Sequence, residues 1–184
     1  MYRFAPASPQ ESIVYGAARP GRSTTHPHSS TDPVQHWLEF MQSQGIQRIC
    51  CLLPEEQLSS YDHLLDRYAD TIGGDRLCWA PITDFDVASP TLLFGQILPF
   101  LAIADQRHEK VVVHCAGGIG RTGQILTAWL IAARGYSPKV AIATVKQTGR
   151  NPYEAVWAAP FTGRNPWAIA AALNTLFEQC RPTQ

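Results

Sequence analysis

The sequence predicts an α/β domain with a central, mostly parallel β-sheet and helices on both of its faces. Short apolar runs alternate along the chain with longer segments in which apolar residues recur every three or four positions, and this alternation is typical of parallel strands connected by helices. The run Val111-Val112-Val113 contains no polar residue, as expected for a strand buried on both faces. The length of 184 residues suits one domain, which we place at residues 13–184, after a frayed N-terminal arm at 1–12.

The first half of the chain is expected to hold three strands and two helices. Asp32 and Pro33 mark the start of the first helix, because Asp is a preferred N-cap and Pro is preferred at the first helical position. The second helix begins at Pro54, and its apolar residues recur at helical spacing as far as Tyr68. In chain order we expect strand 13–15, loop 22–31, helix 33–45, strand 46–53, the helix from 54 and strand 77–82.

The second half is expected to hold one strand and several helices. Pro99 should kink the helix that begins at Ser89-Pro90, because proline has no backbone N–H. The string Thr-Gly-Arg-Asn-Pro occurs at 148–152 and again at 162–166, and in each copy the Asn is expected to cap the helix that follows. The expected elements are helix 90–101, strand 110–114, a helix to about 134, helix 138–149 and helix 166–178.

The most informative stretch runs from His114 to Gly123, where a strand passes through a glycine-rich loop into a helix. Such a loop directs unpaired backbone N–H groups and the positive end of the helix dipole at one point, so it binds anions such as phosphate. Cys115 begins this loop and Arg121 ends it, and this positive environment favours a thiolate at Cys115. The phosphate-binding N–H groups are expected from Ala116, Gly117, Gly118, Ile119, Gly120 and Arg121.

The loop also fits two other patterns less well. Gly118, Gly120 and Gly123 also fit the dinucleotide-binding pattern, which expects an acidic residue about twenty positions further on. No Asp or Glu occurs from Ala116 to Tyr153, which argues against it. A structural interpretation would make Cys115 a buried cysteine at a strand end, but it leaves the joint spacing of the motif unexplained.

The order of cysteine, five residues, arginine, threonine and glycine resembles the signature of the protein-tyrosine-phosphatase superfamily, the CX5R phosphate loop. The resemblance implies the cysteine-phosphatase fold and a phosphocysteine intermediate, with Cys115 as the nucleophile and Arg121 binding two phosphate oxygens. Thr122 is expected to donate a hydrogen bond to the Cys115 sulfur. His114 is expected to position the loop, or else to be a simple core histidine.

The proton donor is expected after the third strand. Residues 79–84 are similar to the Pro-Ile-x-Asp segment of compact dual-specificity phosphatases, including archaeal and cyclin-dependent-kinase-associated types, and this resemblance implies Asp84 as the general acid. Asp86 is the alternative. Relatives often place a glutamine after the next helix to position the attacking water, whereas this chain reads Arg150-Asn151-Pro152 there. Asn151 is the candidate for that role, or only a cap.

Composition limits the classes of function. The net charge is zero, which argues against a nucleic-acid or polybasic membrane binder, and no run reaches transmembrane length. Acidic residues dominate from Pro54 to Asp86, whereas every charge from Ala116 to Tyr153 is basic, so the loop suits an anionic substrate. The five cysteines form no C-x-x-C pairs, which favours a reducing, cytoplasmic setting. We expect no metal, no cofactor and a monomer.

We therefore expect a metal-independent phosphatase acting on phosphoproteins, with phosphotyrosine accepted and phosphoserine or phosphothreonine left open. A small-molecule or lipid phosphate is the alternative within catalysis. Because the loop contains no Lys or Arg before Arg121, a single phosphate group is the better expectation. The alternative from another class is a pseudophosphatase that binds phosphorylated partners without turnover.

Overall fold

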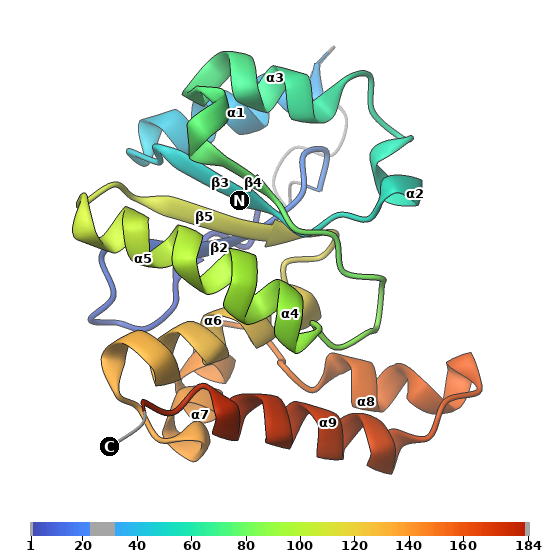
Figure 1. The fold of residues 1–184 in the computed structure, drawn as a ribbon. Helices are drawn as coiled ribbons and strands as arrows, with labels where there is room; N and C mark the ends of the chain where they lie inside the picture. The colour runs from blue at the N-terminus through green and yellow to red at the C-terminus, as the bar shows by residue number, and fades with distance from the viewer. Residues whose placement is uncertain (1, 23–31, 183–184) are drawn as a thin grey trace.

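Among the residues that the computed structural model describes, 2–22 and 32–182, five strands form one sheet (Figure 1). Across the sheet they lie in the order β1 (Ala5–Pro6), β2 (Val14–Ala18), β5 (Val111–Cys115), β3 (Arg48–Cys51) and β4 (Leu77–Trp79). The pairs β2–β5, β5–β3 and β3–β4 are parallel, and β1 is antiparallel to β2. All of β5 is buried. The mostly parallel sheet is thus confirmed.

Helices α1 (Pro33–Ser43) and α3 (Leu64–Ile72) cover one face of the sheet (Figure 1). Asp32 caps α1 as expected, because its carboxylate accepts hydrogen bonds from the Val34 and Gln35 amides, both at 3.0 Å. The buried rings of Trp37 and Tyr68 stack at 5.2 Å between the two helices. This packing forms a core of its own on that side of the sheet.

The opposite face carries the larger core, built on the helices of the second half of the chain (Figure 1). These elements are α4 (Pro90–Leu92), the π-helical turn η2 (Leu93–Ile97), α5 (Leu98–Gln106), α6 (Gly120–Arg134), α7 (Pro138–Gln147), α8 (Glu154–Ala158), the 3-10 helix η3 (Ala159–Thr162) and α9 (Pro166–Gln179). The signature helix α6 is buried over most of its length. Both faces of the sheet are therefore covered, as the sequence predicts.

The helix expected from Pro54 is two helices in the structure, which corrects the sequence prediction. A single turn, α2 (Glu55–Leu58), is followed by an irregular segment, and α3 starts after His63, whose φ is 49°. Within that segment the Tyr61 hydroxyl donates to the Pro20 carbonyl at 2.9 Å. The break lets α2 turn toward the carboxyl end of β5 while α3 stays on the sheet.

Pro99 produces a π-helical turn where a kink was expected. The Leu98 amide donates to the Leu93 carbonyl, five residues back, at the end of η2. Because Pro99 has no N–H to bond a carbonyl four residues back, the wider turn accommodates it with the helix continuing into α5. The short 3-10 helix η1 (Gly74–Arg76) precedes β4.

The N-terminal residues differ from the expected frayed arm. Residues 5–6 form β1, and Ala7, Ser8 and Glu11 are buried. The guanidinium of Arg150, itself buried, donates to the carbonyls of Arg3 at 2.8 Å and Gly16 at 2.6 Å. The arm is therefore tied to the body. Residues 23–31 of the expected loop lie outside the described part of the chain.

The two Thr-Gly-Arg-Asn-Pro copies behave differently. Asn165 caps α9 as expected, accepting hydrogen bonds from the Trp167 amide at 2.9 Å and the Ala168 amide at 3.4 Å. Asn151 does not cap a helix, because α8 starts only at Glu154; its side-chain oxygen accepts from the Tyr153 amide at 3.2 Å. The helix prediction is thus right for the second copy and wrong for the first.

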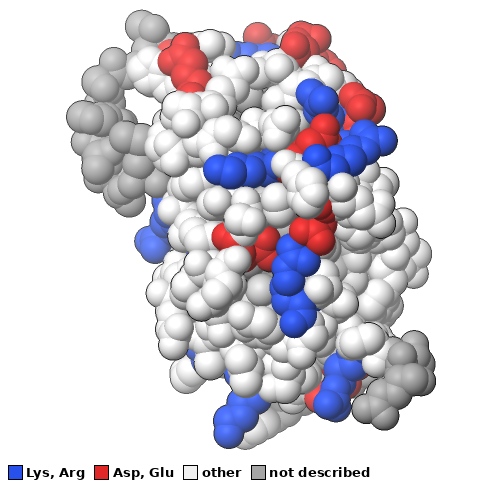
Figure 2. Space-filling model, turned by 90° about the vertical axis from the view of Figure 1, so that its left-hand side faces the viewer, with Lys and Arg blue, Asp and Glu red and all other residues white. Residues whose placement is uncertain are grey.

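Positive and negative side chains lie side by side on the face shown in Figure 2. Arg134 pairs with Glu11 at 3.0 Å and with Asp105 at 2.5 Å, and Arg48 pairs with Glu109 at 2.5 Å. In the described ranges, no helix is long and apolar enough to cross a bilayer.

Candidate active site

The glycine-rich loop lies at the carboxyl end of the central strand. β5 ends at Cys115 and α6 begins at Gly120, and both Cys115 (2% exposed) and Arg121 (3% exposed) are buried. Gly118 has a φ of 69°, and a Cβ there would lie 2.6 Å from the Ala17 backbone. Glycine is therefore required at this point, and the loop closes tightly against β2.

Arg121 makes three contacts that define the site. Its Nη1 donates to the Ile82 carbonyl at 2.9 Å, both terminal nitrogens lie 3.1–3.2 Å from Gln57 Oε1, and Nη2 lies 2.8 Å from Asp84 Oδ1. Gln57 Nε2 in turn donates to Asp84 Oδ2 at 3.0 Å. Gln57 on α2 therefore joins the arginine of the loop to the carboxylate.

The structure brings Asp84, and not Asp86, to Arg121. Asp84 is 42% exposed, so its carboxylate is open to solvent on one side. Asp86 instead pairs with Arg164 at 2.7 Å. The side chain of Gln124 on α6 holds the segment that leads from the two aspartates to α4. It accepts a hydrogen bond from the Ala88 amide and donates one to the Asp86 carbonyl.

Thr122 and His114 are both buried next to the loop. Thr122 Oγ1 has no hydrogen-bond partner among the described residues, so the expected hydrogen bond to the Cys115 sulfur is not formed in this structure. The His114 ring packs against Trp37 and Tyr68, with centroids 5.1 and 5.6 Å away. Burial lowers the pKa of His114 to about 3, so the imidazole is neutral near pH 7.

Glu154 is the nearest carboxylate to the loop from the C-terminal side. A Cβ placed on Gly120 would lie 2.3 Å from Glu154 Oε2, so the side chain lies directly against the start of α6. The pKa of Glu154 is raised above its usual value, and burial is the main cause. The negative charge of Asp84 also raises this pKa, whereas a hydrogen bond from the Gly120 amide and the charge of Arg121 lower it. The carboxylate of Glu154 therefore shares the site with Asp84 and Arg121.

Sequence reasoning missed two residues of this site, Gln57 and Glu154. Glu154 lies three residues beyond Asn151, a spacing that also fits a helix cap, so the sequence does not indicate its place against the loop. Gln57 is not indicated either, because its approach to Arg121 depends on where α2 ends. Over residues 2–22 and 32–182, no three His, Cys, Asp or Glu side chains are grouped so as to hold a metal ion.

Fold and site together define a class of α/β proteins in which a tight glycine-rich loop at the carboxyl end of a central strand begins with a cysteine and ends with an arginine. Residues 33–155 match the family described as "Dual specificity phosphatase, catalytic domain". This match covers most of the chain, and the chain belongs to that family.

Curated relatives match a shorter stretch. The dual specificity protein phosphatase OPG106 of vaccinia virus is 31% identical over 68 residues, which are 37% of this chain and 40% of that protein. Human dual specificity protein phosphatase 5 is 30% identical over 69 residues, 38% of this chain and 18% of that protein. The matches thus span less than half of the length of these relatives.

Three solved structures share the fold over 75% or more of the chain. Tk-PTP in its active form has a TM-score of 0.65 at 21% identity, covering 89% of this chain and 92% of that one. A kinase-associated phosphatase with its catalytic cysteine substituted has a TM-score of 0.61 at 24% identity, covering 75% and 78%. PTPMT1 in complex with PI(5)P has a TM-score of 0.68 at 12% identity, covering 96% of each chain.

Proposed function

We propose that this chain is a metal-independent phosphatase that hydrolyses phosphomonoesters of proteins through a phosphocysteine intermediate. The observation that carries the proposal is a tight loop with Cys115 at its start and Arg121 at its end, and with Asp84 2.8 Å from Arg121. Family membership of residues 33–155 supports it.

In the first step, the Cys115 thiolate attacks the phosphorus atom, a P–S bond forms and the bond to the leaving oxygen breaks. The N–H groups of residues 116–121 and the fork of Arg121 stabilise the equatorial oxygens. Asp84 donates its proton to the leaving oxygen. Its link to Gln57 keeps it in place when phosphate oxygens occupy Arg121.

In the second step, water attacks the phosphorus atom, the P–S bond breaks, and Asp84 accepts a proton from the water. Thr122 donates a hydrogen bond to the departing sulfur. Asn151 is the sequence candidate for aligning the water, but its side-chain oxygen already accepts from the Tyr153 amide. Glu154 is the second candidate, and its place against Gly120 favours it.

For the substrate, we propose a phosphoprotein in the cytoplasm, a reducing compartment that protects Cys115 from oxidation. Phosphotyrosine is expected to react faster than phosphoserine, because a phenol is the better leaving group. A lipid phosphate is the second candidate, favoured by the PTPMT1 neighbour solved with PI(5)P.

Turnover of para-nitrophenyl phosphate in the presence of a chelator tests the proposal. We expect full activity with EDTA and almost none in Cys115→Ser, because the serine alcohol is not ionised near neutral pH. Wild-type protein that binds a phosphotyrosine peptide without releasing phosphate would establish a pseudophosphatase instead. Rates on phosphotyrosine peptide, phosphoserine peptide and phosphoinositide vesicles then separate the substrate classes.

A further inference from the structure

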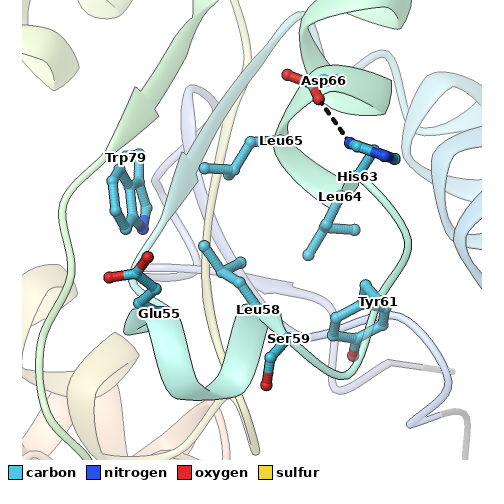
Figure 3. Close-up of a pocket in the computed structure, with 9 residues that line it drawn as sticks. All are labelled: Glu55, Leu58, Ser59, Tyr61, His63, Leu64, Leu65, Asp66 and Trp79. Atoms are coloured by element: carbon cyan, nitrogen blue, oxygen red, sulfur yellow. Dashed lines mark hydrogen bonds and ion pairs between the residues drawn. The ribbon is translucent and has the colours of Figure 1, made fainter.

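A pocket of about 420 Å³ lies between α2, the segment that follows it, α3 and β4 (Figure 3). Leu58, Leu64 and Leu65 supply apolar side chains to it, with Trp79 on one side and Tyr61 on the other. The lining also includes the charged or polar side chains Glu55, Ser59, His63 and Asp66. The proposed reaction uses none of these side chains.

The single turn α2 separates this pocket from the catalytic loop. Gln57 extends to Arg121 and Asp84, whereas Glu55 and Leu58, three residues apart on the same helical face, line the pocket. A helix with its side chains is about 10 Å across, and an extended chain advances about 3.3 Å per residue. A peptide whose phosphorylated residue reaches the loop would thus present to the pocket a side chain about three residues away.

The lining matches a side chain that is apolar along its stem and positive at its end. Lys and Arg bury their methylene groups on apolar surfaces while the charged end stays in water. The face of Trp79 attracts cations, whereas the Tyr61 ring already has the Arg19 guanidinium 5.7 Å from its centroid. Glu55 lies beside Trp79 in Figure 3, and the Asp66 carboxylate lies 3.2 Å from His63 Nδ1. Both carboxylates are exposed at the edge of the pocket, where they attract a positively charged group and repel an acidic one.

We propose that this acidic-aromatic pocket, defined by Glu55, Leu58, Tyr61, Leu65, Asp66 and Trp79, binds a lysine or arginine side chain of the phosphoprotein substrate, about three residues from the phosphorylated residue. The proposal rests on the proposed function and assigns it a substrate class, namely phosphoproteins with a basic residue near the phosphosite. The phosphate loop would then recognise the phosphate, and the pocket would recognise the sequence around it.

The test is a series of phosphotyrosine peptides in which one lysine is moved through each position on either side of the phosphotyrosine, with alanine elsewhere. Norleucine and glutamate replace the lysine in parallel series. We expect lysine to raise kcat/KM at one position by about tenfold, the size of one cation–π contact and one exposed ion pair acting together. Norleucine should give less, and glutamate should lower kcat/KM.

Glu55→Gln should reduce this preference for lysine, and Glu55→Lys should shift it toward glutamate. Glu56→Gln is the matched control, because Glu56 lies in the same turn and carries the same charge but does not line the pocket. Turnover of para-nitrophenyl phosphate, which is too small to reach past α2, should stay unchanged in all three variants and so also reports that they are folded.

The proposal is overturned if lysine, norleucine and glutamate give equal kcat/KM at every position, or if Glu55→Gln and Glu56→Gln weaken the lysine preference equally. The second result would mean that the overall negative charge of α2 attracts lysine, and that binding in the pocket does not. Wild-type protein without activity on para-nitrophenyl phosphate would instead overturn the proposed function. Lipid vesicles hydrolysed with no peptide turnover would contradict the phosphoprotein substrate.

Discussion

Arg121 is paired before any substrate arrives, because Asp84 and Gln57 both contact its guanidinium. A phosphate group that binds Arg121 bidentately has to take over contacts that these side chains make. Asp84 keeps its bond to Gln57, so we expect the carboxyl group to move only slightly and to remain above the loop. In the proposed mechanism, Gln57 therefore positions Asp84.

Asp84→Asn should remove the high-pH limb of the kcat/KM profile, because that limb reports loss of the proton that Asp84 gives to the leaving oxygen. Turnover of a phosphotyrosine peptide should fall by about 10²- to 10⁴-fold. The loss should be smaller for an activated aryl phosphate, whose leaving group needs no proton. Steady-state rates across pH on both substrates measure this.

Asp86→Asn is the control for that experiment. The Asp86 carboxylate pairs with Arg164 at 2.7 Å, so this variant should keep both limbs of the profile. A profile that loses its high-pH limb in Asp86→Asn and keeps it in Asp84→Asn would assign the acid to the other aspartate.

Glu154→Ala should slow the second step and spare the first. We expect kcat to fall while kcat/KM, which reports formation of the phosphocysteine, stays near the wild-type value. Acid-quenched protein should then carry more phosphate on Cys115, as seen by mass spectrometry. Glu154→Gln should recover most of kcat, because an amide can also hold a water. Equal losses of kcat and kcat/KM in both variants would indicate a structural role for Glu154.

Cys115, Arg121 and Asp84 could be named as candidates from the sequence, because the first two belong to one loop motif and Asp84 follows a predicted strand. Gln57 and Glu154 could not, since each reaches the loop through an element whose start or end the sequence does not specify. In α2 the helical pattern of Leu58, Tyr61 and Leu64 continues through a real break. The spacing of apolar residues shows which face of a helix is buried, but it does not show where the helix is interrupted. Because apolar residues lie on both sides of this break, the sequence does not reveal it.

At the scale of elements, the structure keeps the expected order but shortens the strands. The run 46–53 gives a strand of only four residues, β3, because only the residues that pair with β4 and β5 are strand. Residues beyond Cys51 remain buried and apolar, so composition alone cannot mark the end. β1 has two residues and is too short for any periodic signal.

Arg150 donates hydrogen bonds to backbone carbonyls of the N-terminal residues and of β2. We expect its replacement to destabilise both segments. Arg150 is buried, and burial lowers its pKa to about 10, so backbone carbonyls rather than a carboxylate hold its charge. Arg150→Met should leave these carbonyls unpaired and lower stability by about 2 kcal/mol, or roughly 4–8 °C in Tm. Hydrogen exchange should show β1 opening first. Unchanged exchange at residues 3–6 would contradict this role.

At the scale of the whole molecule, charge networks hold the N-terminal residues to the body. Burial raises the pKa of Glu11, but hydrogen bonds from Arg134, the Ile13 amide and Trp129 outweigh it and hold the pKa below its usual value. The hydrogen bond from Arg134 likewise lowers the pKa of Asp105. Both carboxyl groups thus bind protons more readily in the unfolded chain.

The free energy of unfolding should therefore decrease as the pH is lowered. A carboxyl group with a lowered folded pKa stabilises the fold above its unfolded pKa of about 4, and this contribution is lost as the pH falls through the folded value. Glu154 has a raised pKa in the folded state, so its contribution to stability increases as the pH falls. We expect Tm to drop between about pH 5 and pH 2 and the drop to be smaller in Glu11→Gln. Thermal unfolding followed by circular dichroism at each pH measures it; an identical slope in Glu11→Gln would exclude this network as the cause.

The pairing of β2 with β5 has a consequence for where this domain can be cut. The family match begins at residue 33, whereas β1 and β2 lie before it, and β2 pairs with β5 along all five of its residues. A shorter chain starting at residue 33 would expose one edge of a valine-rich strand, with its N–H and C=O groups free to bind another copy. We expect such a chain to aggregate on expression, and its failure would say nothing about catalysis.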